Sequence, residues 1–179
     1  GSVDDRGSPV GRVSAIFTHL AVVARTRAGH HGVTDQAGRV IRLALPLVWL
    51  ADTLRAAGLT VVETDGWQER SATSGPLPAP VGVLEHHTAT PASYEDPAPS
   101  VQLCIDGRPD LEGPLCHAVI GFDGVVHMIA AGRANHAGEA KASGPNPAGD
   151  GNTLYVGFEW DYQGEDQGPS PEQYRAAVT

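Results

Sequence analysis

The chain has 179 residues, of which 41% are hydrophobic, and it carries a formal net charge of -9 at pH 7. This length and apolar content predict one globular domain with its own core, plus a short extension. The acidic balance and the scattered basic residues exclude non-specific binding to nucleic acid or anionic membranes, since both need a basic patch. No apolar run approaches the roughly 20 residues that cross a bilayer, so we expect no membrane insertion.

The two cysteines, Cys104 and Cys116, are too few for a disulfide scaffold. We expect reduced thiols, and the sequence leaves a single bridge between them open. Residues 13–24 make an unconvincing signal peptide, because Arg25 and Arg27 follow where a cleavage region would lie. The sequence therefore does not fix where the protein is located.

The first part of the chain, residues 1–44, shows no sustained hydrophobic period, and we assign it to an N-terminal extension of unclear structure. The domain proper is expected over residues 45–179. It opens with apolar side chains at helical spacing, with Pro46 suited to the first turn and Gly58 to the C-terminal cap. This pattern predicts a helix over residues 46–57.

Strands and helices are both predicted in the rest of the chain, which indicates an α/β fold with the sheet covered on at least one face. The last predicted helix has Ser170 as N-cap, Pro171 at its first position and Gln173 placed for a capping box. The other predicted elements are strands at Leu59–Val62, Val81–Glu85 and Asn152–Gly164, an exposed loop over 66–80, and a β-hairpin over Leu115–Gly132 that turns at Phe122-Asp123-Gly124.

The stretch VLEHHTAT, residues 83–90, sets two adjacent histidines, His86 and His87, at the end of a predicted strand. Neighbouring side chains of a strand point to opposite faces, so one ring can face a cleft while the other packs or meets solvent. The two rings therefore cannot easily bind one ion together. Taken alone, two histidines hydrogen-bonded to the backbone at a strand end remain the alternative interpretation.

Three segments occur in an order and spacing that resembles the zinc-dependent N-acetylmuramoyl-L-alanine amidases of type 2: GVLEHHTAT, GPLCHAVIGFDGVVHMIAAGRANHAG and NTLYVGFEW. That family includes phage endolysins, bacterial amidases and animal peptidoglycan recognition proteins. The segments DGWQERS and DGRPDLEGPL resemble more narrowly the versions from actinobacteria and their phages. The resemblance covers residues 45–179. It implies a mixed central β-sheet flanked by helices, and hydrolysis of the amide bond between N-acetylmuramic acid and L-alanine in peptidoglycan.

The resemblance also implies a bound zinc ion and roles for two residues. His86, the first histidine of the HHT-like motif, matches the family's first zinc ligand. A catalytic zinc site has three protein ligands and a fourth position for water. Glu159 matches a carboxylate that would move a proton from metal-bound water to the leaving nitrogen. A strand glutamate that simply faces solvent is the alternative for Glu159.

Further residues match positions around the family's substrate groove. His136 and His117 correspond to polar groove positions, and we also assign His87 to substrate binding, with a purely structural histidine as the alternative for each. Cys116 stands where some relatives carry a tyrosine that assists catalysis, and this chain lacks that hydroxyl. A thiolate can bind zinc, but the family pattern does not place a ligand at Cys116. We expect His127 to be structural.

The family's other two zinc ligands, a histidine and then an aspartate or cysteine, follow the last long helix, and this chain ends at Thr179 inside that helix. We therefore expect a fragment of a working amidase, monomeric and acting on the cell wall, with peptidoglycan muropeptide as its partner. The alternative is a module that binds muropeptide without cutting it. A third possibility is an unrelated α/β domain with accidental histidines.

Overall fold

The computed structural model describes residues 33–34, 40–41, 46–72, 77 and 80–179, so most of the predicted N-terminal extension lies outside the described residues. Within the described part of the chain, no helix has the length and apolar character needed to cross a membrane. In chain order the elements are β1 (Val33–Thr34), β2 (Val40–Ile41), the 3₁₀ helix η1 (Leu47–Trp49), α1 (Leu50–Ala56), β3 (Val61–Glu63), β4 (Gly82–His87), α2 (Val101–Asp106), β5 (Gly107–Arg108), β6 (Leu111–Glu112), β7 (Ala118–Ile120), β8 (Val126–Met128), β9 (Glu139–Ala140), β10 (Gly149–Asp150), α3 (Gly151–Leu154), β11 (Tyr155–Trp160) and α4 (Pro171–Ala177).

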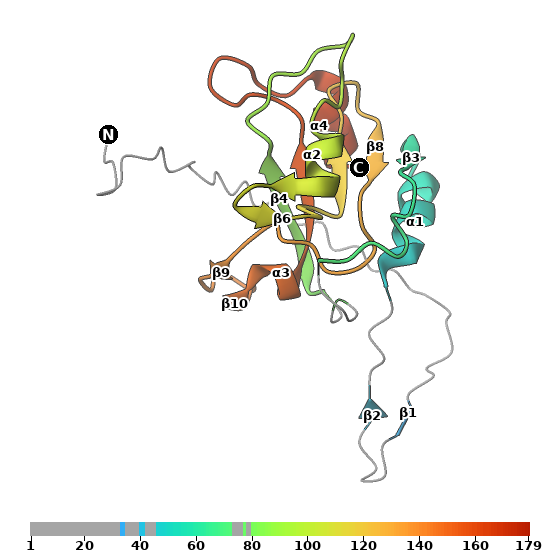
Figure 1. Cartoon of the computed structure of the whole chain (residues 1–179), viewed down its shortest axis with the longest axis vertical. Helices are drawn as coiled ribbons and strands as arrows, with labels where there is room; N and C mark the ends of the chain where they lie inside the picture. Colours follow the sequence, from blue (N-terminus) through green and yellow to red (C-terminus); the bar gives the residue numbers. More distant parts are fainter. Residues whose placement is uncertain (1–32, 35–39, 42–45, 73–76, 78–79) are drawn as a thin grey trace, which may run out of the picture.

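The centre of the molecule is a five-stranded sheet in the order β3-β8-β7-β11-β4. Strands β7 and β8 pair antiparallel, whereas β3 pairs parallel with β8, and β11 pairs parallel with both β7 and β4. Figure 1 shows β4 and β3 at opposite sides of this sheet, with α1 beside β3. A mixed sheet flanked by helices is the predicted α/β fold, which is thereby confirmed.

The β7–β8 hairpin confirms the prediction of two strands around an Asp-Gly turn. Gly124 has φ +81°, a left-handed conformation that glycine adopts without the steric penalty of a Cβ. The Asp123 carboxylate accepts a hydrogen bond from the N–H of Val125 (3.0 Å), which closes the turn. The turn therefore forms from signals that lie within a few residues of one another.

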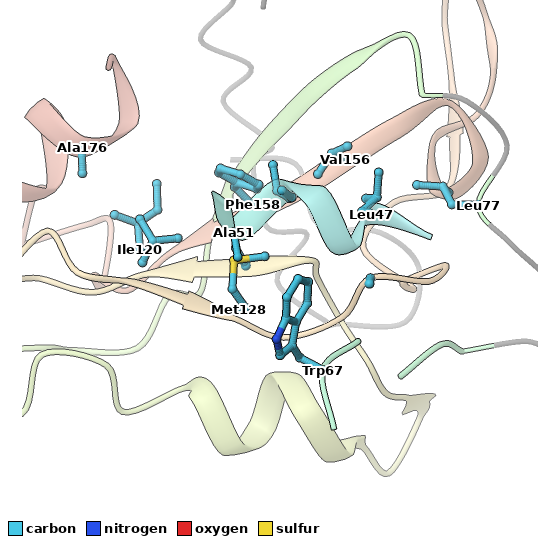
Figure 2. Packing of buried hydrophobic residues seen from close by; sticks show 13 residues of the cluster. Leu47, Ala51, Trp67, Leu77, Ile120, Met128, Val156, Phe158 and Ala176 are labelled. Atoms are coloured by element: carbon cyan, nitrogen blue, oxygen red, sulfur yellow. The ribbon is translucent and has the colours of Figure 1, made fainter. Parts of the chain in front are cut away.

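One face of the sheet packs against η1, α1 and α4 and forms the main hydrophobic core. Because side chains alternate along a strand, every second residue of β7, β8 and β11 enters this core. Figure 2 shows Ala51 close to Met128 and Phe158, and Leu47 close to Val156. The buried members are Leu47, Leu50, Ala51, Trp67, Leu77, Ala118, Ile120, Val126, Met128, Ala131, Val156, Phe158 and Ala176.

The opposite face of the sheet is covered by α2 and is much less apolar. Its hydrophobic cluster is small and consists of Cys104, Cys116, Val119 and Ile129. Other positions on this face, among them Glu159 and Asp161, are polar. We call this the α2 face, and the first one the α1 face.

The segment predicted as an exposed loop over 66–80 holds two core residues, so that prediction is wrong for them. Trp67 is 3% exposed and Leu77 is 1% exposed. Trp67 Nε1 donates a hydrogen bond to Glu63 Oε2 (2.7 Å), which satisfies the polar edge of the indole inside the core. Glycines and prolines punctuated the segment, but an apolar side chain between them can still turn inward.

The predicted helix over 46–57 is confirmed as η1 followed by α1, and several other boundaries differ. Strand β4 extends through both histidines instead of ending before them. The first residues of the predicted strand Asn152–Gly164 form α3, because the Asp150 side chain caps a helical turn by accepting from the N–H of Asn152 (3.1 Å). Helix α2 and the β5–β6 hairpin lie where we predicted only loop after β4.

Helix α4 begins as predicted, with Pro171 first and Ser170 as N-cap. Ser170 Oγ accepts from the N–H of Gln173 (2.9 Å). The reciprocal half of the predicted capping box is absent, because the Gln173 amide instead donates to the carbonyls of Ile120 (2.8 Å) and Asp161 (3.2 Å). This side chain thereby ties α4 to the ends of β7 and β11.

Candidate functional site

The strand register brings His86 and Glu159 together. His86 on β4 and Glu159 on β11 are direct partners in the parallel ladder, so their backbones lie about 4.8 Å apart and their side chains share one face. Glu159 is also the ladder partner of Val119, a residue of the small cluster under α2. The predicted metal ligand and the predicted catalytic carboxylate therefore both lie on the α2 face.

His87 points to the opposite face, as the alternation of strand side chains requires. Its ladder partner is Trp160, and its ring stacks on Tyr162 with centroids 4.9 Å apart. A Cβ at Gly164 would overlap this ring, so glycine there leaves room for the imidazole. The structure does not bring His87 to the face that carries His86, and its role in substrate binding stays a prediction.

His136 reaches the α2 face from the loop after β8 and lies over β11. Its Nδ1 lies 3.3 Å from His86 Nε2, and its Nε2 lies 3.1 Å from the Tyr155 carbonyl oxygen. A Cβ at Gly157 would sit 2.8 Å from Cδ2 of His136 and closer still to Cγ. The ring fits against β11 only because residue 157 has no side chain.

His117 completes a row of three imidazoles that we call the histidine row: His86, His136 and His117. The ring centroid of His136 lies 5.5 Å from that of His86 and 5.4 Å from that of His117. His117 is fully buried, and its Nδ1 accepts a hydrogen bond from the N–H of Gly157 (2.8 Å). Sequence analysis predicted these histidines one by one but not their arrangement in a row.

Burial keeps the histidine row neutral at pH 7. Desolvation lowers the pKa of His117 to about 4. Desolvation also lowers the pKa of His136 to about 3, and the neighbouring His117 and His86 add to the effect. The pKa of His86 is lowered mainly by burial and further by His87. Neutral imidazoles can act as hydrogen-bond acceptors and as metal ligands.

Asn152 fixes the loop that carries His136, and sequence analysis did not single it out. Its Oδ1 accepts hydrogen bonds from the backbone N–H groups of His136 (2.8 Å) and Ala137 (2.7 Å). Asp150, which caps the N–H of Asn152, also pairs with Arg133 at 2.8 Å. An asparagine two positions after an aspartate and shortly before a strand was the available signal, but this pattern is common in turns of every kind.

Glu159 and His136 line a pocket of about 370 Å³ beside the sheet, whereas His86 and His117 are not among its lining residues. The hairpin β5–β6 contributes Arg108 and Leu111 to one side. The other lining residues are Leu115, Asn135, Ala137, Gly138 and Asn152. The pocket is therefore walled partly by elements that the sequence analysis did not predict.

Glu159 has a strongly perturbed carboxyl group. The side chain is half-buried, and its Oε2 is enclosed without a hydrogen-bond partner among the described residues. Burial first, and then the nearby Asp161 charge, raise the pKa of Glu159 to about 8, while Arg108 opposes the shift. At pH 7 the carboxyl group is therefore mainly protonated, a state typical of a catalytic acid.

Cys116 is fully buried beside Cys104, and both thiols are free. Burial is the main reason that the pKa of Cys116 lies well above its usual value. A thiol that stays protonated is a poor zinc ligand and a poor nucleophile. His127, which is half-buried, has an Nε2 without a partner among the described residues.

The described residues do not fit a complete zinc centre. Across residues 46–72, 77 and 80–179, no group of three or more His, Cys, Asp or Glu side chains is arranged to hold a metal ion. A catalytic zinc site needs three protein ligands. His86 is the single residue of this part of the chain that the family motif predicts as a ligand.

Comparisons with known proteins identify the family. The model of the N-acetylmuramoyl-L-alanine amidase family matches residues 76–179, which is more than half of the chain. The chain therefore belongs to this family. Membership connects it with peptidoglycan, as an amidase or as a binding protein. Among curated proteins, none matches the sequence.

Solved structures similar to this chain include peptidoglycan recognition proteins of insects. Bumblebee PGRP-SA has 18% sequence identity and a TM-score of 0.47, with 66% of this chain and 70% of that chain covered. Drosophila PGRP-SD has 22% identity and a TM-score of 0.46, with 66% and 70% covered. Drosophila PGRP-SA has 20% identity and a TM-score of 0.47, with 66% and 68% covered.

Proposed function

We propose that this chain carries part of the active site of a zinc-dependent N-acetylmuramoyl-L-alanine amidase, which hydrolyses the amide bond between N-acetylmuramic acid and L-alanine of peptidoglycan. The observation that supports it most is the ladder pairing of His86 with Glu159, a carboxyl group with a raised pKa that lines a pocket. Family membership supplies the substrate class.

Glu159 is suited to both proton transfers of amide hydrolysis. Its protonated form can donate to the leaving nitrogen, and its ionised form can accept a proton from the attacking water. A pKa of about 8 keeps both forms accessible near neutral pH. Such a carboxyl group contributes typically about 10²- to 10⁴-fold to the rate.

The pocket suits a polar substrate of moderate size. Its volume of about 370 Å³ falls within the roughly 300–1,000 Å³ of small-molecule sites. Arg108, Asn135 and Asn152 contribute polar groups to its wall. A muropeptide offers amides and hydroxyls that such groups can bind. His86 would supply one zinc ligand, and the zinc would polarise the scissile carbonyl when bound.

The second candidate function is binding of muropeptide without cleavage. It is favoured by one observation, the lack of a three-ligand metal group among the described residues. One imidazole cannot replace a three-ligand catalytic zinc site. The same pocket would then recognise peptidoglycan through its polar wall alone.

The two functions separate in one assay of the purified chain with muropeptide in the presence and absence of added Zn²⁺. Zinc-dependent release of peptides with a new L-alanine amino terminus supports the amidase. Binding by calorimetry without release supports the binding module. Neither binding nor release would contradict both.

Two variants test the assigned residues in the same assay. Glu159→Gln is expected to keep muropeptide binding and to lose about 10²- to 10⁴-fold in turnover. His86→Ala is expected to lose zinc-dependent release. The matched control is Glu85→Gln, because Glu85 is a strand glutamate one position before His86 on the opposite face. Equal losses in Glu85→Gln and Glu159→Gln would remove the basis for the catalytic assignment.

A further inference from the structure

We infer that His136 is a positioning residue that holds the imidazole of His86 as a single tautomer, with hydrogen on Nε2 and a bare lone pair on Nδ1. The inference follows from the two hydrogen bonds that His136 makes, one to the backbone of β11 and one to His86. It concerns atoms that neither the family match nor the proposed function assigns.

The backbone carbonyl sets the direction of the chain of hydrogen bonds. A carbonyl oxygen can only accept, so the Nε2 of His136, 3.1 Å from the Tyr155 oxygen, must carry hydrogen. A neutral imidazole carries one ring hydrogen, so its Nδ1 can only accept. The atom 3.3 Å from that Nδ1 is His86 Nε2, which therefore donates.

The surroundings of His136 favour the neutral ring on which this direction depends. The ring lies against the bare backbone of Gly157, between two other imidazoles. Within the described residues, neither ring nitrogen is hydrogen-bonded to a carboxylate. A charged imidazolium without a hydrogen-bonded carboxylate is disfavoured where most of the ring is buried.

The other nitrogen of His86 is open. Its Nδ1 makes no hydrogen bond within the described residues, and it is not among the enclosed polar atoms that lack a partner. Among the described residues nothing is hydrogen-bonded to Nδ1, and the ring lies on the α2 face, the face that Glu159 shares. A lone pair in this position can bind a divalent cation or accept a proton from a ligand.

His136 is held firmly enough to impose the tautomer. Asn152 accepts from the backbone N–H of His136 (2.8 Å) and so fixes the loop at that residue. Because Gly157 has no side chain, the His136 ring packs directly against the backbone of β11. Metal-binding histidines in general donate their second ring N–H to a fixed acceptor, which sets the ring orientation. Here the acceptor is a second imidazole.

The tautomer is measured directly by long-range ¹H–¹⁵N correlation NMR on the chain labelled with ¹⁵N-histidine. The expected spectrum of the wild type shows His86 with hydrogen on Nε2 alone. In His136→Leu, which removes both ring nitrogens, His86 is expected to become a mixture of both tautomers. His136→Gln keeps a donor and an acceptor on a smaller side chain and is expected to preserve the wild-type pattern at least in part.

The control is His127→Gln, because His127 lies on the same sheet face and makes no hydrogen bond to His86 within the described residues. It is expected to leave the His86 signals unchanged. Hydrogen on Nδ1 of His86 in the wild type, or an unchanged His86 spectrum in a folded His136→Leu, would overturn the inference. If His136→Leu does not fold, the wild-type and His136→Gln spectra still decide it.

The role of the bare lone pair as a zinc ligand rests on the proposed function, whereas the tautomer does not. If the chain binds Zn²⁺ in calorimetry, His136→Leu is expected to weaken binding about 10- to 100-fold. If the chain binds no Zn²⁺, the proposed zinc-dependent function fails, and the NMR spectrum still decides the tautomer. The two failures are therefore distinguishable.

Discussion

The two faces of the central sheet are built from the same strands but have opposite character. Phe158 and Glu159 are neighbours on β11, yet Phe158 enters the large apolar core while Glu159 lines the pocket. Polar atoms enclosed without partners among the described residues occur on both faces, with Glu159 Oε2 and His127 Nε2 on the α2 face and His87 Nδ1 and Trp160 Nε1 on the other. Each such atom costs roughly 1–3 kcal/mol. What separates the faces is that the α1 face holds the large apolar core, whereas the α2 face holds a small cluster beside the groups with the strongly shifted pKa values, His117, His136 and Glu159.

The largest expected effect is on the α1 face. Phe158→Ala removes a ring that is 9% exposed and leaves a cavity in the main core. We expect a loss of about 3–5 kcal/mol in the free energy of unfolding. Urea unfolding measures this loss. The comparison is the change in the free energy of unfolding caused by Glu159→Gln at low pH, where the carboxyl group of the wild type is protonated. If Phe158→Ala lowers the free energy of unfolding no more than Glu159→Gln does, the two faces do not differ in their contribution to stability.

The next effect is the pH dependence of stability that Glu159 on the α2 face causes. The pKa of Glu159 is raised to about 8 in the folded protein, against about 4.3 in an unfolded chain. The folded state thus binds the proton more tightly, and this stabilisation is complete below the unfolded value and is lost as pH rises through about 8. We expect the Glu159 carboxyl group alone to account for a loss of a few kcal/mol over this range, seen as the difference between the wild type and Glu159→Gln.

Glu159→Gln is expected to remove that dependence, because the amide does not ionise. The measurement is urea unfolding of both proteins across the same pH series. Parallel curves for wild type and variant would show that the carboxyl group has an ordinary pKa. The lowered pKa values of His117 and His136 have the opposite effect on the stability of the protein. Their contribution to stability is lost as pH falls from about 6.5 toward about 4 for His117 and about 3 for His136.

A smaller loss of stability is expected at Gly157 on β11, the strand whose side chains enter both faces. In Gly157→Ala the new Cβ would overlap the ring of His136. We expect about 1–3 kcal/mol of destabilisation, together with displaced NMR signals of His136 and His86. The matched control is Gly82→Ala on β4, whose Cβ would have its nearest neighbour, in Tyr155, at an ordinary 3.5 Å. Equal behaviour of the two variants would contradict the packing of His136 on β11.

The smallest effect concerns a helix that covers the α1 face. Ser170→Ala removes the N-cap of α4 and the hydrogen bond from its hydroxyl to the Phe122 carbonyl. We expect a loss of about 0.5–2 kcal/mol, seen as a lower midpoint in thermal unfolding. Ser143→Ala, at an exposed serine, serves as the control. A midpoint unchanged by Ser170→Ala would mean that the cap contributes little to α4.

Local signals in the sequence predicted much of the fold. The turn at Gly124 and the cap at Ser170 depend on residues within three positions of each other, so they can be interpreted without tertiary structure. Helix α2 was missed because it is short and follows a proline-rich stretch. Trp67 was placed outside the core because its glycine-rich surroundings resemble a loop, although its indole packs inward.

The candidate site was predictable in its members but not in its geometry. The motifs predicted His86, Glu159, His136 and His117 as site residues, since each lies in one of the three segments that resemble the amidase family. The pairing of His86 with Glu159 depends on the register between β4 and β11, which distant packing decides. The order of the histidine row likewise depends on a loop folding over β11, and no local signal specifies that.

The fit of an imidazole against a bare α-carbon makes positions 136 and 157 interdependent in evolution. A lineage that keeps the ring at 136 cannot accept even a methyl group at 157 without moving the loop. A lineage that replaces the ring with a small residue is released from that constraint. The two positions should therefore covary among homologues, and their joint identity would distinguish relatives that retain the histidine row from those that have lost it.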